Sequence, residues 1–274
     1  MQMKILRNNV LLILLVVGLI SSLSLCYKVS KSNRKLKKLV ESLESQLHTK
    51  SVFDFYQISE LEKEKLEKLS KSQLKQDIFA YLELGRKERG FFVEFGATNG
   101  VSLSNSYMLE RDFGWNGILA EPAKIWHDQL KANRPNSIIE TLCIWKDSGS
   151  KLTFNQTNDN ELSTIDKYSD HDMHEKARKN GEKYDVVTIS LLDLFKKHNA
   201  PQVIDYLSID TEGSEFEILE AFFRDNDYYE IKIITCEHNF TPNREKIFEL
   251  LKKYGYQRKY QVISAFDDFY VLQK

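Results

Sequence analysis

The stretch FFVEFGATNG at residues 91–100 is an apolar run of strand length that leads directly into a turn with two glycines. It predicts a β-strand over Phe91–Phe95, then a turn and a helix. Backbone amides in such a turn can hold an anionic group of a ligand. Because Thr98 stands where a dinucleotide fingerprint requires its second glycine, the turn disfavours a pyrophosphate. An ordinary strand-to-helix turn is the alternative.

A second carboxylate follows the next apolar run, because GILAEP at residues 117–122 places Glu121 directly after a predicted strand. A carboxylate at this distance can accept hydrogen bonds from both ribose hydroxyls of a nucleoside. A solvent-facing turn residue before a proline is the alternative. The E-x-G-x-x-x-G spacing suits the amino-acid end of S-adenosylmethionine (SAM). We therefore expect a SAM site formed by Glu94, Gly96, Ala97, Gly100, Glu121 and Asp210.

More acids follow two later apolar runs, IDYLSIDTEGSE at residues 204–215 and CEHN at residues 236–239. Ligands of open α/β sheets bind at the carboxyl ends of the strands. We expect Asp210 to border the reacting centre and His238 to act as a base, with Glu237 and Glu212 as alternatives. A structural role for His238 remains open, and so does a helix-capping role for Glu215, the last residue of the first run. No defined metal-ligand spacing is present, so we expect no metal, although Asp210, Glu237 or His238 could coordinate a hard cation.

Short apolar runs alternate with amphipathic segments from residue 90 onward, which indicates an α/β fold with a mostly parallel sheet and helices on both faces. The expected strands are Phe91–Phe95, Gly117–Ala120, Ile138–Leu142, Asp205–Ile209 and Ile231–Cys236. The expected helices are Ser104–Phe113, Ala123–Asn133, Glu215–Phe223 and Asn243–Tyr254. The segments Tyr256–Ile263 and Phe269–Leu272 predict an antiparallel hairpin at the end of the chain. The segment 145–200 shows too little pattern for an assignment.

Taken together, these motifs resemble the FkbM-type family of SAM-dependent methyltransferases over residues 73–274. The resemblance rests on FVEFGATNGVSLSNSYMLERDFGWNGILAEP, IDYLSIDTEGSEFEIL and ITCEHNFTPNREKIFELL. It implies a Rossmann-like class I methyltransferase fold that binds SAM, and an oxygen acceptor on a sugar, glycan or other small molecule. Two alternatives are a non-catalytic SAM- or glycan-binding protein on the same fold and an enzyme that uses a nucleotide sugar.

The N-terminal region differs from the rest of the chain, because residues 10–27 carry no charge. As a helix, this segment of about 18 residues would be about 27 Å long, close to the thickness of a bilayer's hydrocarbon core. We expect a single-pass transmembrane anchor after a short tail, residues 1–9. A cleaved signal peptide and a lipoprotein site at Cys26 are less favoured alternatives. The lysines and arginine that follow the segment predict a catalytic domain on the cytosolic side.

Residues 28–72 follow as a basic stalk, in which Leu36, Leu39, Leu43 and Leu47 recur at helical spacing. Such a stripe allows self-association through the stalk. Ser59 and Glu62 have the form of a helix capping box, and the apolar stripe after them predicts one helix that continues to about Leu82.

The composition excludes several classes of function. With 39 basic and 40 acidic residues the formal net charge is −1, so nucleic acid is not an expected partner. Three scattered cysteines do not form a disulfide framework or a zinc motif. The expected partners are therefore the acceptor and, through the anchor, a membrane.

Overall fold

The computed structural model describes residues 52–53, 55–157, 160–261 and 264–273. Contacts divide the chain into two units, residues 1–47 and 48–274, and all described residues belong to the second. The predicted anchor at 10–27 and most of the stalk lie outside the described residues. Among the described helices, none combines the length and the apolar character that crossing a membrane requires.

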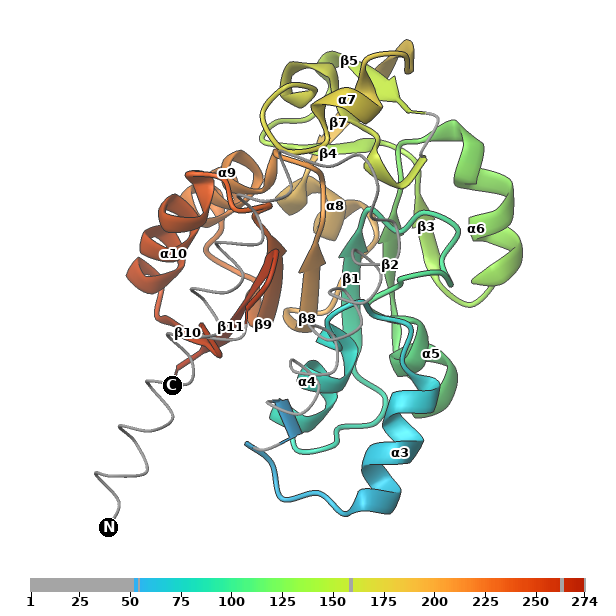
Figure 1. The fold of residues 1–274 in the computed structure, drawn as a ribbon. Coiled ribbons are helices and arrows are strands. Elements are labelled where there is room, and N and C mark those ends of the chain that lie inside the picture. Colours follow the sequence, from blue (N-terminus) through green and yellow to red (C-terminus); the bar gives the residue numbers. More distant parts are fainter. Residues whose placement is uncertain (1–51, 54, 158–159, 262–263, 274) are drawn as a thin grey trace, which may run out of the picture. The chain divides into compact units, whose positions relative to one another are not determined.

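The larger of two sheets has seven strands in the order β10-β11-β9-β8-β1-β2-β3. Only β11 runs antiparallel to its neighbours, β9 and β10, and every other neighbouring pair of this sheet is parallel. The strands are β1 Phe91–Phe95, β2 Asn116–Ala120, β3 Ile138–Glu140, β8 Val203–Ile209, β9 Glu230–Glu237, β10 Tyr256–Lys259 and β11 Asp267–Leu272. The predicted parallel sheet with a C-terminal hairpin is confirmed (Figure 1).

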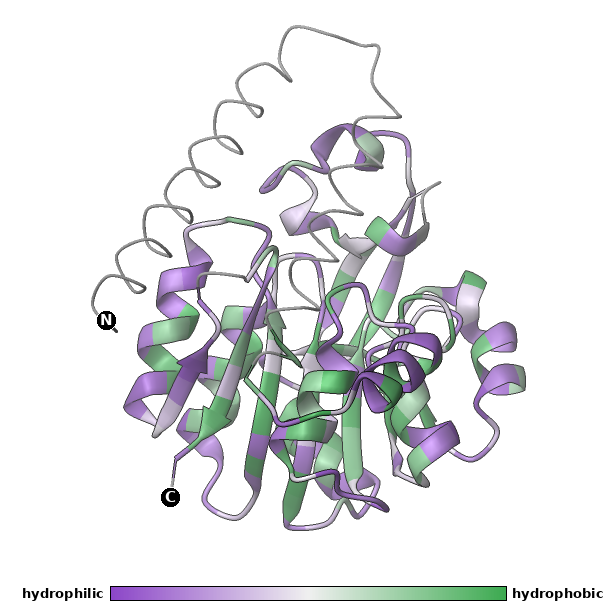
Figure 2. Cartoon of the chain, turned by 60° about the horizontal axis from the view of Figure 1, so that its bottom comes forward, coloured by the Kyte–Doolittle hydropathy of each residue, from purple (hydrophilic) through white to green (hydrophobic). Residues whose placement is uncertain are grey.

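The central strands are mostly apolar because both faces of the sheet are covered, with buried exceptions such as Glu94 and Asp205. Successive side chains point to opposite faces. Phe92 and Tyr206, paired between β1 and β8, therefore face one core, and the next pair, Val93 and Leu207, faces the other. Figure 2 shows hydrophobic residues along these strands and mixed colours on the surrounding helices.

Helices cover both faces of the larger sheet, as the sequence predicts. One core includes residues of α8 (Leu191–Lys197), α9 (Glu215–Asp225) and α10 (Asn243–Lys253). The other includes residues of α3 (Glu60–Leu69), α4 (Gln76–Glu83), α5 (Tyr107–Phe113) and α6 (His127–Asn133), which follows the short helix η1 (Lys124–Trp126).

The single helix expected from Ser59 to about Leu82 is wrong, because the chain forms two helices, α3 and α4. Ser59 caps α3 as predicted, since its hydroxyl accepts a hydrogen bond from the amide of Glu62. The break has a local cause: Ser70 leaves the helix in an extended conformation and donates a hydrogen bond to Asp77 at 2.7 Å. Leu66 is buried in the core, so the packed unit also begins before the predicted start at residue 73.

The segment left unassigned by the sequence folds into a second sheet with the order β4-β7-β5-β6. Its strands are β4 Cys143–Trp145, β5 Lys151–Gln156, β6 Thr164–Ile165 and β7 Glu182–Ser190, with short helices η2 Asn160–Leu162, η3 Asp166–Tyr168 and α7 Glu175–Arg178. In Figure 1 it lies at the top, beside the carboxyl ends of β1 and β8. The second sheet is bonded to the loop after β8, because the hydroxyl of Thr164 in β6 donates a hydrogen bond to the carbonyl of Glu212 at 2.9 Å.

Candidate active site

The glycine turn after β1 is held against the end of β8. Gly96 has φ of +68°, and a Cβ added there would lie 2.2 Å from the carbonyl oxygen of Asp210. Gly100 has φ of +78°, and its Cβ would lie 2.6 Å from a side-chain carbon of Leu130. Both positions therefore need glycine for conformation and for space. Ala97 is buried, and its amide already donates a hydrogen bond to the carbonyl of Ala120 at 3.3 Å.

Glu121 joins the glycine turn to the end of β2. Its Oε2 accepts a hydrogen bond from the amide of Thr98 at 2.9 Å, and its Oε1 accepts one from the amide of Ala123 at 2.7 Å. Burial raises the pKa of Glu121 to about 7, although both amides act in the opposite direction. A carboxylate oxygen can accept more than one hydrogen bond, so this side chain can also receive the hydroxyls of a ribose.

Glu94 serves a different segment from the one predicted. Its Oε1 accepts a hydrogen bond from the amide of Asn105 at 2.8 Å, and its Oε2 accepts from the hydroxyls of Ser104 and Ser106. The carboxylate therefore fixes the chain just before α5. It contributes to the site by placing that segment beside the glycine turn.

Arg134 is a second support that the sequence did not indicate. Its guanidinium is fully buried and donates hydrogen bonds to the carbonyl of Gly100 at 2.9 Å and to the hydroxyls of Ser104 and Ser106. It also forms an ion pair with Glu110 at 2.7 Å. Nothing in the polar segment around Arg134 distinguishes it from a solvated arginine, because its partners come from distant parts of the chain.

Three of the predicted acids converge at the carboxyl ends of β8 and β9. Carboxylate oxygens of Asp210, Glu212 and Glu237, here called the acidic cluster, all lie within 4.8 Å of one another. Burial, reinforced by the neighbouring Glu215, raises the pKa of Asp210 to about 7. Burial and the charge of Asp210 raise the pKa of Glu212 and of Glu237 well above the ordinary value. The structure thus brings together three of the four predicted catalytic residues.

Arg178 of α7 is the cation that faces this cluster. It donates to Glu212 at 2.7 Å and to Asp172 at 2.8 Å, and its side chain is fully buried. Asn239 donates to the same oxygen of Glu212 at 3.1 Å. Because Arg178 lies in the segment that the sequence left unassigned, no signal in the sequence linked it to the site.

Glu215 has a structural role, but it bonds to the loop before α9 instead of capping the helix as the sequence suggested. Its Oε1 accepts hydrogen bonds from the amides of Thr211 at 2.9 Å and Gly213 at 3.0 Å. The carboxylate stands at the first turn of α9, where a negative charge also suits the helix dipole. Glu215 therefore shapes the loop that carries Glu212.

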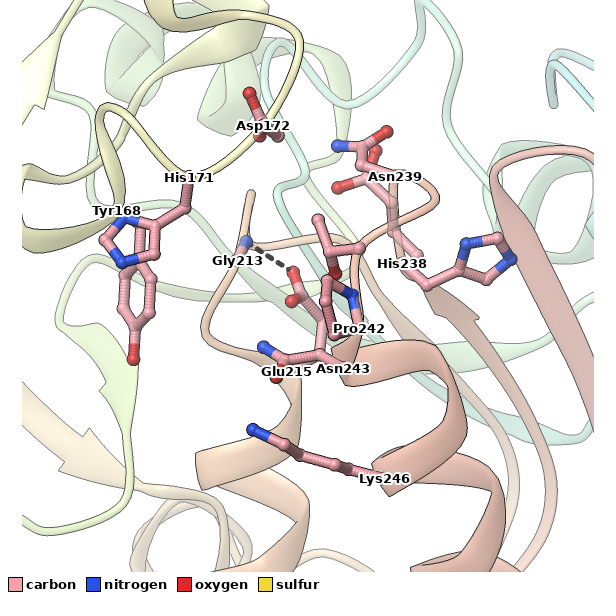
Figure 3. A pocket seen from close by; sticks show the side chains of 12 residues that line it. Tyr168, His171, Asp172, Gly213, Glu215, His238, Asn239, Pro242, Asn243 and Lys246 are labelled. Atoms are coloured by element: carbon pink, nitrogen blue, oxygen red, sulfur yellow. Dashed lines mark hydrogen bonds between the residues drawn. The ribbon is translucent and has the colours of Figure 1, made fainter.

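His238 does not take the position expected of a base. Its Nδ1 accepts a hydrogen bond from the amide of Phe240 at 3.1 Å, and its Nε2 lies 3.8 Å from a carboxylate oxygen of Asp268. Figure 3 shows the ring turned away from Glu215 and Lys246. Burial lowers the pKa of His238 to about 4, which makes it a weak acceptor of a hydroxyl proton near neutral pH. The structure favours the structural role for this residue.

A cavity of about 210 Å³ adjoins the acidic cluster (Figure 3). The second sheet's segment contributes Tyr168, His171 and Asp172 to its wall, and Glu237 belongs to the opposite side. The other lining residues are Gly213, Glu215, His238, Asn239, Thr241, Pro242, Asn243 and Lys246. Most of the exposed surface of the cavity is apolar, and it can accept a small molecule next to the carboxylates.

Comparison with solved structures finds several methyltransferases. A methyltransferase FkbM from Methylobacillus flagellatus has 12% identity and a TM-score of 0.40, and the match covers 67% of this chain and 43% of that one. An O-methyltransferase from Bacillus cereus in complex with SAH has 10% identity and a TM-score of 0.40, with 91% and 96% covered. A precorrin-6y C5,15-methyltransferase from Geobacter metallireducens has 11% identity and a TM-score of 0.38, with 80% and 93% covered. The chain thus spans less than half of the first of these proteins.

Comparison with curated proteins finds no match. The model of the methyltransferase FkbM domain matches residues 94–258. The matched range starts at Glu94 and includes the glycine turn, Glu121 and the whole acidic cluster. Because this range is more than half of the 274 residues, the chain belongs to the FkbM methyltransferase family.

Proposed function

We propose that this chain is a SAM-dependent O-methyltransferase that acts on a hydroxyl of a sugar, glycan or other natural product. The observation that carries the proposal is the position of Glu121. Glu121 directly follows β2, and its carboxylate accepts a hydrogen bond from the amide of Thr98 in the glycine turn, so the two regions predicted to contact SAM are bonded to each other.

The charges at this edge of the sheet fit SAM. A cation beside Glu121 and Asp210 would stabilise their charged forms, so this edge favours a ligand with a sulfonium and an ammonium group over a pyrophosphate. When bound, SAM would supply an electrophilic methyl group. Gly96, Ala97 and Gly100 would hold its amino-acid part through backbone groups, and Glu121 would hold its ribose.

The acceptor would occupy the cavity beside the acidic cluster. A hydroxyl held there would lie near Asp210, Glu212 and Glu237, and one of these carboxylates would accept its proton. Asp210 suits this role best, because its pKa of about 7 makes it a stronger base than an exposed carboxylate. Walls on both sides of the cavity would align the acceptor oxygen with the methyl group and keep water away.

We also propose that residues 10–27 anchor the chain in a membrane, with the catalytic domain on the cytosolic side and the stalk available for self-association. The uncharged segment and the basic residues after it support this arrangement. Alkaline extraction of membranes that contain the full-length chain should leave it in the pellet. Protease added to sealed vesicles should then distinguish the two orientations.

Calorimetry with SAM and with SAH tests the cofactor site. We expect saturable binding by the wild type and at least a tenfold loss of affinity in Glu121→Ala, because that substitution removes both the ribose acceptor and the link to Thr98. Unchanged affinity would remove Glu121 from the site. Methyl transfer to a panel of hydroxylated acceptors tests catalysis, and SAM binding without turnover on any of them would favour the non-catalytic alternative.

A further inference from the structure

The acidic cluster is built by the register of the sheet. Ile209 of β8 pairs with Cys236 of β9, so the residues that follow them lie side by side: Asp210 just after β8 and Glu237 as the last residue of β9. Glu212 returns to the same place from the next turn, where its φ of +59° is unusual for a residue with a side chain. The register of β8 and β9 and the short loop after β8 therefore bring the three carboxylates together.

One oxygen in the cluster lacks a partner. Glu237 is 6% exposed, and its Oε2 has no hydrogen-bond partner among the described residues. Carboxylate oxygens of Asp210 and Glu237 also lie within 4.8 Å of each other, where two ionised groups repel unless a proton or a cation lies between them. The nearby guanidinium of Arg178 pairs with Glu212 and Asp172, so it does not neutralise these two acids.

We propose that Asp210, Glu212 and Glu237 bind a divalent cation of the hard type, such as Mg²⁺ or Mn²⁺. Oxygen ligands of one such ion lie about 2.0–2.6 Å from it and hence about 3–5 Å from one another. The carboxylate oxygens of the cluster, within 4.8 Å of one another, match this range. A shared proton would serve only one pair of oxygens, whereas a cation engages all three carboxylates and the unpartnered Oε2.

The position of the site gives the cation a function, and this step rests on the proposed methyl transfer to a hydroxyl. Glu237 lines the cavity next to the cluster, so a cation bound there would face the acceptor. A coordinated hydroxyl would give its proton more readily to a cluster carboxylate oxygen that does not ligate the cation, because the cation would stabilise the resulting alkoxide. The cation would also fix the orientation of the acceptor toward the methyl group.

Titration of the purified full-length chain with Mn²⁺, followed by electron paramagnetic resonance of the free ion, tests the site without activity. We expect saturation at one Mn²⁺ per chain, competition by Mg²⁺, and affinity at least about tenfold weaker in Asp210→Asn and in Glu237→Gln. Asp170→Asn is the matched control, because Asp170 carries the same charge on an exposed side chain and should leave the affinity unchanged.

Iron-catalysed backbone cleavage of the wild type, mapped by mass spectrometry, locates the site without any substitution. Cuts close to residues 210 and 237 would support the proposal, and cuts only elsewhere would overturn it. Absence of saturable Mn²⁺ binding by the wild type would also overturn it, as would unchanged affinity in both cluster variants. SAM calorimetry on the same sample separates the two proposals. SAM binding without Mn²⁺ binding would reject only the cation site, and absence of SAM binding by the wild type would reject the proposed function.

Discussion

Gly96→Ala tests whether the close contact between the glycine turn and the end of β8 is essential. The added Cβ would lie 2.2 Å from the carbonyl oxygen of Asp210, and the residue would keep a φ of +68°. The left-handed conformation costs about 1–2 kcal/mol for a residue with a side chain. Relief of the steric clash requires a movement of about 1 Å, and overpacking of this kind typically costs about 1–3 kcal/mol more.

Gly85→Ala separates these two contributions. Gly85 has nearly the same φ, +66°, but a Cβ added there meets no atom within 4 Å. The unfolding free energy of Gly85→Ala should therefore fall only by the conformational cost, about 1–2 kcal/mol, whereas that of Gly96→Ala should fall by about 2–5 kcal/mol in total. Urea denaturation followed by circular dichroism measures both values. A domain stable by about 5–15 kcal/mol would remain folded in Gly85→Ala, and in Gly96→Ala wherever its stability exceeds that loss.

The same pair of variants tests the role of the turn in binding. A shift of the turn away from Asp210 moves Thr98 and the bonded Glu121, so Gly96→Ala should bind SAM at least about tenfold more weakly, or about 1.4 kcal/mol. Gly85→Ala should bind SAM like the wild type. Equal unfolding free energies for the two variants would refute the steric reasoning, and equal SAM affinities would refute the link to the cofactor.

Three further predictions follow from buried charges. In the presence of a chelator and without ligand, the unfolding free energy should fall as pH rises from about 5 to 8. Burial raises the pKa of Glu121 to about 7 and of Asp267 to about 8, so the folded chain holds protons that the unfolded chain has lost. Glu121→Gln should flatten this slope in urea titrations, and a wild-type stability that rises with pH would contradict the assignment. His238→Asn should keep the rate of methyl transfer and its pH profile, since Asn can still accept the amide of Phe240; disappearance of one limb of the profile would restore His238 as the base. Arg178→Met should lower the unfolding free energy measured in urea by about 3–5 kcal/mol, because it leaves two buried carboxylates without their cation. Lys179→Met, at an exposed side chain, should lower it by about 1 kcal/mol or less. Similar losses in the two variants would argue against a buried ion pair.

Local patterns in the sequence determined the main sheet and the location of its site. The largely apolar run Phe91–Phe95 indicated a strand buried on both faces, and β1 has the predicted bounds. Parallel strands end at one edge of a sheet, so acids that follow separate runs, such as Glu121 and Asp210, were expected to lie near one another. Gly96 and Gly100 were likewise recognisable, because their conformation is a local property of the turn.

Tertiary structure alone decided the features that depend on distant parts of the chain. The helical stripe that continues past Leu69 could not show that the serines beyond it, such as Ser70, would bond to side chains and end α3. The buried guanidinium of Arg178 meets Glu212 across 34 positions, and no local period encodes such a pair. His238 followed a strand end as a base would, yet its side chain turned toward Phe240 and Asp268. Spacing along a chain predicts which backbone positions meet at an edge, but the direction of each side chain depends on the partners that packing brings to it.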